Sequence, residues 1–268
     1  MIFNLSKKNS KKNLSYFSIL KIKIMLLVID VGNSRIKAAV FEENILLEKF
    51  VFQKEKLVEE INNIVDSFAK IKDVIVSSVG SIDENHFSFL NERVKIIFIN
   101  HQSRFPFKNN YSTPSTLGID RMVLAAGASL LYPDYNKLII DAGTCVTYDY
   151  IDDKNTYLGG AISPGIKLRY ESLHNYTAKL PLLEKKVPEN LIGNSTKESI
   201  HSGVVIGLKN EIDGFIDNYI SSNAKFIIIL TGGDADFLAK QLKNTIFANS
   251  NFLLESLNLL YQYNQKND

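Results

Sequence analysis

Two short acidic turns contain the residues best suited to bind phosphate and metal ions. The first follows an apolar run and reads Asp30-Val31-Gly32-Asn33-Ser34, and the second repeats the pattern as Asp141-Ala142-Gly143-Thr144. In the first turn, Gly32 can adopt positive φ and let another group approach the backbone. The Asn and Ser that follow it add side-chain donors beside the backbone N–H groups. Such a turn can bind phosphate, and Asp30 can hold Mg²⁺, directly or through water.

The repetition of this turn indicates two related domains. A single Asp-x-Gly turn is weak evidence, because Asp and Gly also fill ordinary hairpin turns. Here two copies lie about 110 residues apart, and each copy follows a buried apolar run. We therefore expect each domain to point one turn at a shared cleft.

The spacing of apolar residues predicts an α/β protein, because short apolar runs alternate with stretches of helical period. In the first half we expect strands at 24–31, 35–41, 45–52, 74–78 and 94–99 and helices at 56–70, 83–91 and 120–131. In the second half we expect strands at 137–141, 144–151 and 226–230 and helices at 166–178, 199–220, 234–243 and 253–263. Pro133 ends the helix before it, which divides the chain into domains 25–133 and 134–268. Successive strands followed by alternating helix and strand indicate mixed sheets.

The amino-acid composition argues against nucleic acid and the membrane as partners. With 268 residues and 45% hydrophobic content, the chain can form two modest cores. The formal net charge is +2, but residues 1–24 hold six lysines and no acidic residue, so the body is mildly acidic. This balance argues against nucleic acid as the main partner, and no apolar run is long enough to predict a membrane span. We interpret residues 1–24 as a basic tail, either disordered or preceding a true start at Met25.

The cysteine and histidine content argues against a disulfide bond and against a metal site built from histidines. Cys145 is the single cysteine, so no intrachain disulfide can form and nothing implies an oxidising compartment. We expect it to be a small buried hydrophobic residue. The four histidines, His86, His101, His174 and His201, show no metal-ligand spacing, and we interpret them as structural or surface residues.

Three more motifs complete a recognisable set. They are Gly118-Ile119-Asp120-Arg121, Gly159-Gly160-x-Ile162-x-Pro164-Gly165 and Thr231-Gly232-Gly233. With the two acidic turns, and over residues 25–264, the chain resembles the acetate and sugar kinase/actin superfamily and, within it, the type III pantothenate kinases. The resemblance implies an α/β, two-domain actin-like or ribonuclease H-like kinase fold, with mixed sheets and a cleft between the domains. It implies ATP-dependent phosphorylation of pantothenate, the first step of coenzyme A synthesis, in the cytoplasm.

The resemblance also implies cofactors, partners and site residues. It implies Mg²⁺, a monovalent cation (K⁺ or NH₄⁺), and a homodimer with the substrate site at the interface. Asp120 matches the general base, Asp141 the monovalent-cation ligand, and Asp30 the residue that orients Mg²⁺. The ATP-binding matches are Asp30, Val31, Gly32, Asn33, Ser34, Arg35, Ile36, Lys37, Thr144, Gly232 and Gly233. The substrate-binding matches are Tyr111, Gly118, Ile119, Asp120, Arg121 and Thr196, the last of these supplied by the partner subunit. The family usually has Thr where this chain has Ser34.

Several of these residues also have a purely structural interpretation. Asp120 begins an apolar-periodic helix, so it could be a helix N-cap, and Thr196 could cap the helix near Ser199. Arg121 could be a surface residue, although its guanidinium suits a carboxylate-bearing substrate. Tyr111 lies in an irregular segment, 100–117, whose length favours a functional loop.

Three alternative functions stay open at this point. The chain could be another small-molecule kinase of the superfamily, such as a sugar kinase, which would share the nucleotide turns. It could be a non-catalytic accessory or regulatory protein of the same fold, although such a protein would not need Asp30, Asp120 and Asp141 together. An actin-like filament protein would lack the substrate motif.

Overall fold

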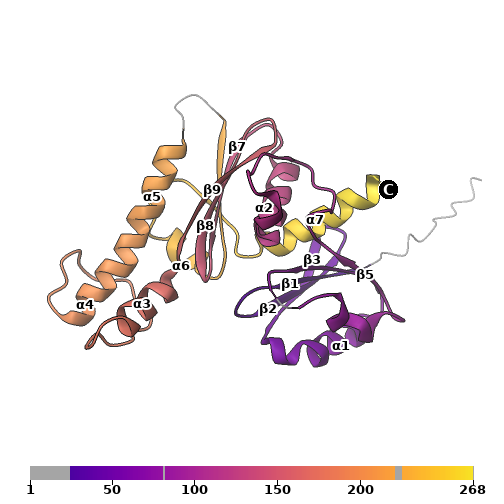
Figure 1. Cartoon of the computed structure of the whole chain (residues 1–268), viewed down its shortest axis with the longest axis horizontal. Helices are drawn as coiled ribbons and strands as arrows, with labels where there is room; N and C mark the ends of the chain where they lie inside the picture. The colour runs from indigo at the N-terminus through magenta and orange to yellow at the C-terminus, as the bar shows by residue number, and fades with distance from the viewer. Residues whose placement is uncertain (1–24, 81, 221–224, 268) are drawn as a thin grey trace, which may run out of the picture.

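Two mixed β-sheets form the frame of the computed structural model, which describes residues 25–80, 82–220 and 225–267 (Figure 1). The predictions for residues 1–24 lie outside the described residues. The first sheet has the order β3-β2-β1-β4-β5, with β1 Met25–Val31, β2 Ile36–Glu42, β3 Ile45–Phe52, β4 Ile71–Ser78 and β5 Lys95–Phe98. The second has the order β11-β10-β7-β8-β9-β6, with β6 Lys108–Asn109, β7 Asn136–Ala142, β8 Cys145–Ile151, β9 Thr156–Pro164, β10 Phe226–Thr231 and β11 Phe247–Ala248.

The two sheets repeat one plan. In the first, β1 pairs antiparallel with β2 and parallel with β4. In the second, β7 pairs antiparallel with β8 and parallel with β10. Asp30 on β1 and Asp141 on β7 occupy equivalent places, one residue before the end of a central strand. The predicted α/β fold with mixed sheets is confirmed, and the repeated acidic turns correspond to a repeated sheet.

The helices lie on the faces of these sheets, and several differ from the predicted bounds. They are α1 Leu57–Ser67, α2 Ile119–Leu131, α3 Ile166–Asn175, α4 Thr196–His201, α5 Gly207–Tyr219, α6 Ala235–Ala239 and α7 Phe252–Asn267. The predicted helix 199–220 is interrupted by a π-helical segment, Ser202–Ile206, between α4 and α5. Residues 83–91 form a 3₁₀ helix, Glu84–Leu90, in which the Asp83 side chain accepts from the Asn85 N–H.

Three apolar cores hold these layers together. One joins the first sheet to α1, and another joins the second sheet to α3, α4, α5 and α6. The third lies between the sheets and is built on α2 and α7 (Figure 1). The run Leu26–Ile29 is fully apolar because β1 is buried on both faces, with alternate residues in two different cores.

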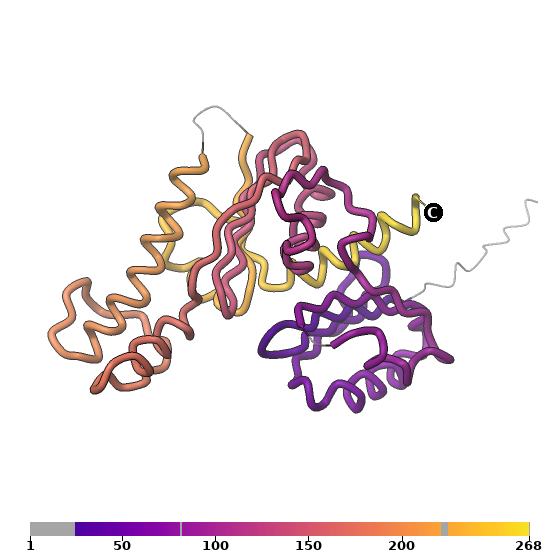
Figure 2. The backbone as a smooth tube through the Cα atoms, in the orientation of Figure 1, coloured from indigo at the N-terminus to yellow at the C-terminus, as the bar shows by residue number. Residues whose placement is uncertain are grey.

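Helix α7 joins the end of the chain to its first half. Figure 2 shows this yellow C-terminal helix running beside the indigo strands of the first sheet. The Asn258 amide donates to the Glu43 carbonyl (2.9 Å), and the Tyr261 hydroxyl donates to Asp73 (2.7 Å). The division into domains 25–133 and 134–268 therefore stays a prediction, with α7 reaching across it. No helix among the described residues is long and apolar enough to cross a membrane.

Candidate functional site

A cavity of about 760 Å³ lies between the two sheets, and both acidic turns line it. It also touches α3, the loop at 182–185, the segment at 232–236 and the start of α7. The predicted site residues that line it are Asp30, Gly32, Asn33, Ser34, Arg35, Lys37, Asp120, Asp141, Thr144, Gly232 and Gly233. Val31 and Ile36 are buried in the core beneath the first turn, so they can contribute only through the backbone. We call this cavity the interdomain cleft.

The two acidic turns touch each other across the cleft. The Ser34 and Thr144 hydroxyl oxygens are 3.3 Å apart, although the residues belong to different sheets. The first turn is closed by the Gly32 N–H, which donates to the Arg35 carbonyl at 3.1 Å. Gly32 does not use the positive φ that glycine can adopt, because it lies outside the left-handed region. The meeting of the two turns confirms that both halves of the chain face one cleft.

Asp30 is desolvated in this cleft. Burial raises the pKa of its carboxyl from 3.8 to about 6, while Lys37 and a hydrogen bond from Ser77 lower it and Asp120 raises it. The Ser77 hydroxyl on β4 donates to Asp30 Oδ1 at 3.0 Å. Asp30 is only 5% exposed, so this β1 carboxyl has little access to water in the absence of a ligand.

Asp141 is in a more unfavourable electrostatic position. Burial raises the pKa of its carboxyl to about 7, with Lys37 lowering it and Asp120, Asp30 and Asp149 all raising it. A Cβ atom on Gly232 would lie 2.4 Å from Asp141 Oδ1, and Gly232 has φ +96°, so this position requires glycine. The Thr-Gly-Gly segment is thereby held directly against the second acidic turn.

The carboxyl groups of Asp30 and Asp141 could each bind a cation that takes its remaining ligands from a substrate. No group of three or more His, Cys, Asp or Glu side chains among the described residues could hold a metal ion unaided. Asp30 is nevertheless buried and Asp141 partly buried, burial raises the pKa of both carboxyls, and carboxylate oxygens suit hard cations. Mg²⁺ in particular is commonly held by one or two carboxylates together with substrate phosphates.

Asp120 lies in the first turn of α2 and faces the same cleft. The N-cap of α2 is Gly118, so the interpretation of Asp120 as the N-cap is wrong, although its Oδ1 accepts the Arg121 N–H at 2.8 Å. A Cβ on Gly118 would lie 2.4 Å from that oxygen, which explains the glycine two positions before the acid. Burial raises the pKa of Asp120, and the Arg121 N–H and charge partly offset it.

The other residues of this motif point away from the cleft. Ile119 is buried in the core between the sheets. Arg121 is 6% exposed and pairs with Asp149 on β8 at 2.8 Å, so the interpretation of Arg121 as a surface residue is wrong. The Arg121 Cζ atom lies 6.0 Å from the centre of the Tyr111 ring, which brings these two predicted substrate residues together.

Thr196 lies in a different hollow. It lines a cavity of about 780 Å³ formed by the end of α3, the loop before α4 and the start of α4. The N-cap of α4 is Ser195, whose hydroxyl accepts the Glu198 N–H at 3.3 Å, so the capping role predicted for Thr196 is wrong. Thr196 is exposed, and the single chain does not bring it into the interdomain cleft.

Sequence reasoning missed several residues of the cleft. Lys49 on β3 donates to Asn251 at 2.7 Å, which joins the two halves at its rim. Lys185, in the loop between α3 and α4, pairs with Asp234 at 2.5 Å. Cys145 is exposed and lines the cleft, so the prediction of a buried cysteine is wrong.

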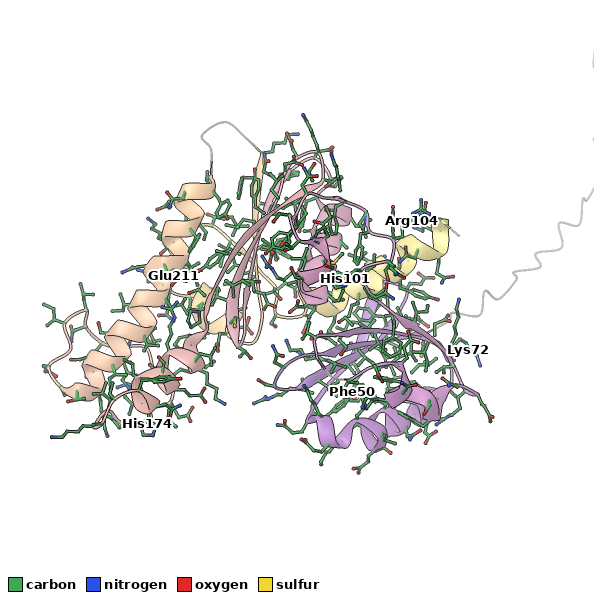
Figure 3. All side chains as sticks on the ribbon, in the orientation of Figure 1. Phe50, Lys72, His101, Arg104, His174 and Glu211 are labelled. Atoms are coloured by element: carbon green, nitrogen blue, oxygen red, sulfur yellow. The ribbon has the colours of Figure 1, made fainter. Side chains whose placement is uncertain are left out.

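The four histidines have structural partners. His101 contacts the Leu117 carbonyl and His174 the Leu180 carbonyl, each at 2.8 Å, and Figure 3 shows these two side chains at distant parts of the molecule. His86 pairs with Asp83 at 2.8 Å, and His201 with the Tyr170 hydroxyl at 2.7 Å. Their interpretation as structural or surface residues agrees with these contacts.

Comparison with known proteins identifies the family. Residues 26–218 match the family model of the type III pantothenate kinases. The chain belongs to the type III pantothenate kinase family. A type III pantothenate kinase of Flavobacterium johnsoniae is 59% identical over 91% of this chain and 100% of its own length. One from Christiangramia forsetii is 48% identical over 90% of this chain and 99% of its own.

Solved structures support the fold of this type III pantothenate kinase. A Campylobacter jejuni protein described as a candidate transcriptional activator of the Baf family superposes with a TM-score of 0.61 and 22% identity, covering 90% of this chain and 99% of that one. A Listeria monocytogenes protein described as a candidate N-acetylmannosamine kinase gives a TM-score of 0.52 and 12% identity, covering 91% of this chain and 100% of that one. At these identities, the likeness shows the shared fold alone.

Proposed function

We propose that the interdomain cleft transfers the γ-phosphoryl group of ATP to the hydroxyl group of pantothenate. Membership of the type III pantothenate kinase family makes this chain a kinase whose reaction is the first step of coenzyme A biosynthesis, with ATP as the phosphate donor. The observation that carries the proposed site is that Asp30, Asp120 and Asp141 line one cavity in which two phosphate-type turns face each other.

Asp120 is our choice for the general base. It would accept the proton of the pantothenate hydroxyl as that oxygen attacks the γ-phosphorus. Burial raises the pKa of this carboxyl, which makes it a better proton acceptor than an exposed aspartate. Phosphoryl transfer has a loose transition state, so the main requirement on the base is correct placement. The Arg121 N–H fixes one carboxyl oxygen at 2.8 Å and supports this role.

Cations complete the charge balance of the proposed site. ATP would bring its phosphates into a cleft that already holds three carboxyl groups, with Lys37 lowering the pKa of both Asp30 and Asp141. We assign Mg²⁺ to Asp30, directly or through water, and a monovalent cation, K⁺ or NH₄⁺, to Asp141. When bound, such ions neutralise the charge that develops on the transferred group. The backbone and hydroxyl donors of the two turns, with Gly232 and Gly233, would hold the ATP phosphates.

The acceptor site would combine residues from two copies of the chain. Tyr111, Gly118 and Arg121 lie on or beside the start of α2, next to the base. Thr196 lies in the separate hollow described above. The segments that form this hollow also carry two exposed apolar residues, Tyr176 at the end of α3 and Ile192 in the loop before α4 (89% and 84% exposed). Exposed apolar surface of this kind favours a protein contact. We therefore infer a homodimer in which Thr196 of the partner subunit reaches the acceptor, and a cytoplasmic location where ATP is supplied.

The first experiment measures ADP release from ATP and Mg²⁺, with and without pantothenate, in K⁺ and again in Na⁺. We expect pantothenate-dependent ADP release that is much faster in K⁺. A sugar such as glucose serves as the control acceptor, because a sugar kinase of the same fold would use it. Absence of turnover in both salts, with ATP still bound, would contradict the proposal and favour an accessory protein.

A further inference from the structure

A buried ion pair lies directly behind the proposed acceptor site. Asp149 on β8 is fully buried, and Arg121 on α2 is 6% exposed. Their neighbours in this layer are apolar and include Ile119, Ile151 and Tyr157. Burial raises the pKa of Asp149, and the charge of Arg121 together with three hydrogen bonds lowers it only in part. A charged pair has therefore been placed in the core that joins the two sheets.

The contacts of Asp149 fix one edge of the Arg121 guanidinium. Asp149 Oδ1 accepts from Arg121 Nε at 2.8 Å and from the Tyr157 hydroxyl at 2.6 Å, and Oδ2 accepts from the Thr147 hydroxyl at 3.1 Å. Both carboxylate oxygens are thus engaged, and the carboxylate has little freedom to rotate. The Tyr111 ring lies near the guanidinium carbon, at 6.0 Å from ring centre to Cζ.

One nitrogen of the guanidinium is left without a hydrogen bond. Arg121 Nη2 lies 2.8 Å from Asp149 Oδ1, within ion-pair range, but it has no hydrogen-bond partner among the described residues. A buried donor of this kind is uncommon, because an unmade hydrogen bond costs about 1–3 kcal/mol. This nitrogen is buried against Asp149, so an acceptor can reach the guanidinium only at its edge away from Asp149.

Stability alone does not account for this pair. Desolvating two charges offsets much of their attraction, and apolar replacements of buried ion pairs are often neutral or stabilising. Holding Arg121 in one orientation is a more specific role, because a guanidinium binds a carboxylate best when its planar fork is already directed.

We propose that Asp149 is a positioning residue that holds one edge of the Arg121 guanidinium so that its other edge can donate to the carboxylate of the acceptor substrate. Tyr157 and Thr147 hold Asp149 in place. This inference rests on the proposed function, since it takes Arg121 as the group that binds the acceptor. Asp149 would thus act on the choice of substrate without touching it.

The test compares pantothenate with its alcohol analogue, in which a hydroxymethyl group replaces the carboxylate. In the Asp149→Asn protein we expect the KM for pantothenate to rise about tenfold, since hydrogen bonds to charged groups contribute about 1.5–3 kcal/mol. The KM for ATP should stay within about twofold, because nucleotide and acceptor are held by different residues. The preference for pantothenate over the alcohol should fall by the same factor as the pantothenate KM rises.

Tyr157→Phe is the matched variant, because it removes one donor to Asp149 without leaving a charge unpaired. It should raise the same KM by about threefold, because Asp149 loses one of its hydrogen bonds but keeps its ion pair with Arg121, and it still tests the proposal if Asp149→Asn does not fold. In Arg121→Met, the further change Asp149→Asn should no longer alter the preference. An unchanged preference in either folded single variant, or an equal rise in both KM values, would overturn the positioning role. Wild-type protein without pantothenate-dependent turnover would overturn the proposed function itself.

Discussion

The two acidic turns are equivalent by topology but differ in their surroundings. Asp30 is paired in its sheet with Lys37 on β2 and Ser77 on β4. Asp141 is paired at the equivalent place with Thr147 on β8 and Thr231 on β10. The cation and the hydroxyl beside Asp30 both lower the pKa of its carboxyl, which rises only to about 6.

The second turn lacks an equivalent lysine and lies closer to other acids. Asp120, Asp30 and Asp149 all raise the pKa of Asp141, which reaches about 7. The second acidic turn, although equivalent to the first by topology, is therefore surrounded by more uncompensated negative charge. This difference supports our proposal that Asp141 holds the monovalent cation, whereas Lys37, paired with Asp30, offsets part of the charge of the first turn.

Replacing the base should give the largest effect. Asp120 is the carboxyl between the two turns, and in Asp120→Asn we expect kcat to fall by about 10²–10⁴-fold, the usual contribution of a general base. ATP affinity, measured by calorimetry, should change little, because both turns stay intact. Asp153→Asn, at an exposed position after β8, is the control. Full activity in the Asp120→Asn protein would contradict the assignment.

Replacing Asp141 tests the difference between the turns without using turnover. Its folded-state pKa is raised from 3.8 to about 7, so its contribution to the free energy of unfolding is complete below about pH 4 and is lost as pH rises through 7. The ion-free wild-type protein should therefore lose stability over this range. Asp141→Asn should flatten the profile and raise stability at pH 8 by an amount on the order of a few kcal/mol.

The same profile identifies the ion. Added K⁺ should restore much of the wild-type stability at pH 8 and have a much smaller effect on Asp141→Asn, as expected for a ligand that binds only the folded state. Asp30→Asn should give a smaller rise at pH 8, because the pKa of Asp30 is only about 6. Equal pH profiles of stability for wild type and Asp141→Asn would show that the pKa of Asp141 is not raised, and would contradict the proposed difference between the two turns.

The hollow at Thr196 provides the next smaller effect. Thr196→Ala should raise the KM for pantothenate by about fivefold, the loss of one hydrogen bond, whereas Ser67→Ala, at an exposed position on α1, should not. Mixing the Asp120→Asn and Thr196→Ala proteins sharpens the test, because a mixed dimer would contain one site with both residues intact. If the mixture gains no activity, the acceptor site is not shared between subunits.

Much of the cleft could be predicted from local sequence. An apolar run that ends in Asp-x-Gly marks a buried central strand and its turn, and the repetition of that pattern predicted two turns facing one cleft. Asp120 could be placed because the start of α2 has a strong periodic signal. These features depend on residues that are close together in the sequence, which is where patterns are informative.

The remaining features depend on contacts between distant residues. Alternation along β8 places Thr147 and Asp149 on one face, but it cannot show that Arg121 packs there from α2. Cys145 is the first residue of β8, and its exposure depends on where the opposite wall of the cleft lies. Helix α7 could be predicted from its period, but its position between the sheets is fixed by tertiary packing.

The smallest predicted effect concerns the point at which the two turns touch. The Ser34 and Thr144 hydroxyl oxygens are 3.3 Å apart. Ser34→Thr keeps the hydroxyl and adds one methyl group at an exposed position, so the KM for ATP should stay within about twofold. Ser34→Ala and Thr144→Ala each remove one hydroxyl and should raise that KM by about threefold to tenfold. Because the two hydroxyls contact each other, the double variant should show less than the sum of the two effects. Full additivity in ATP binding would mean that the two turns bind phosphate independently.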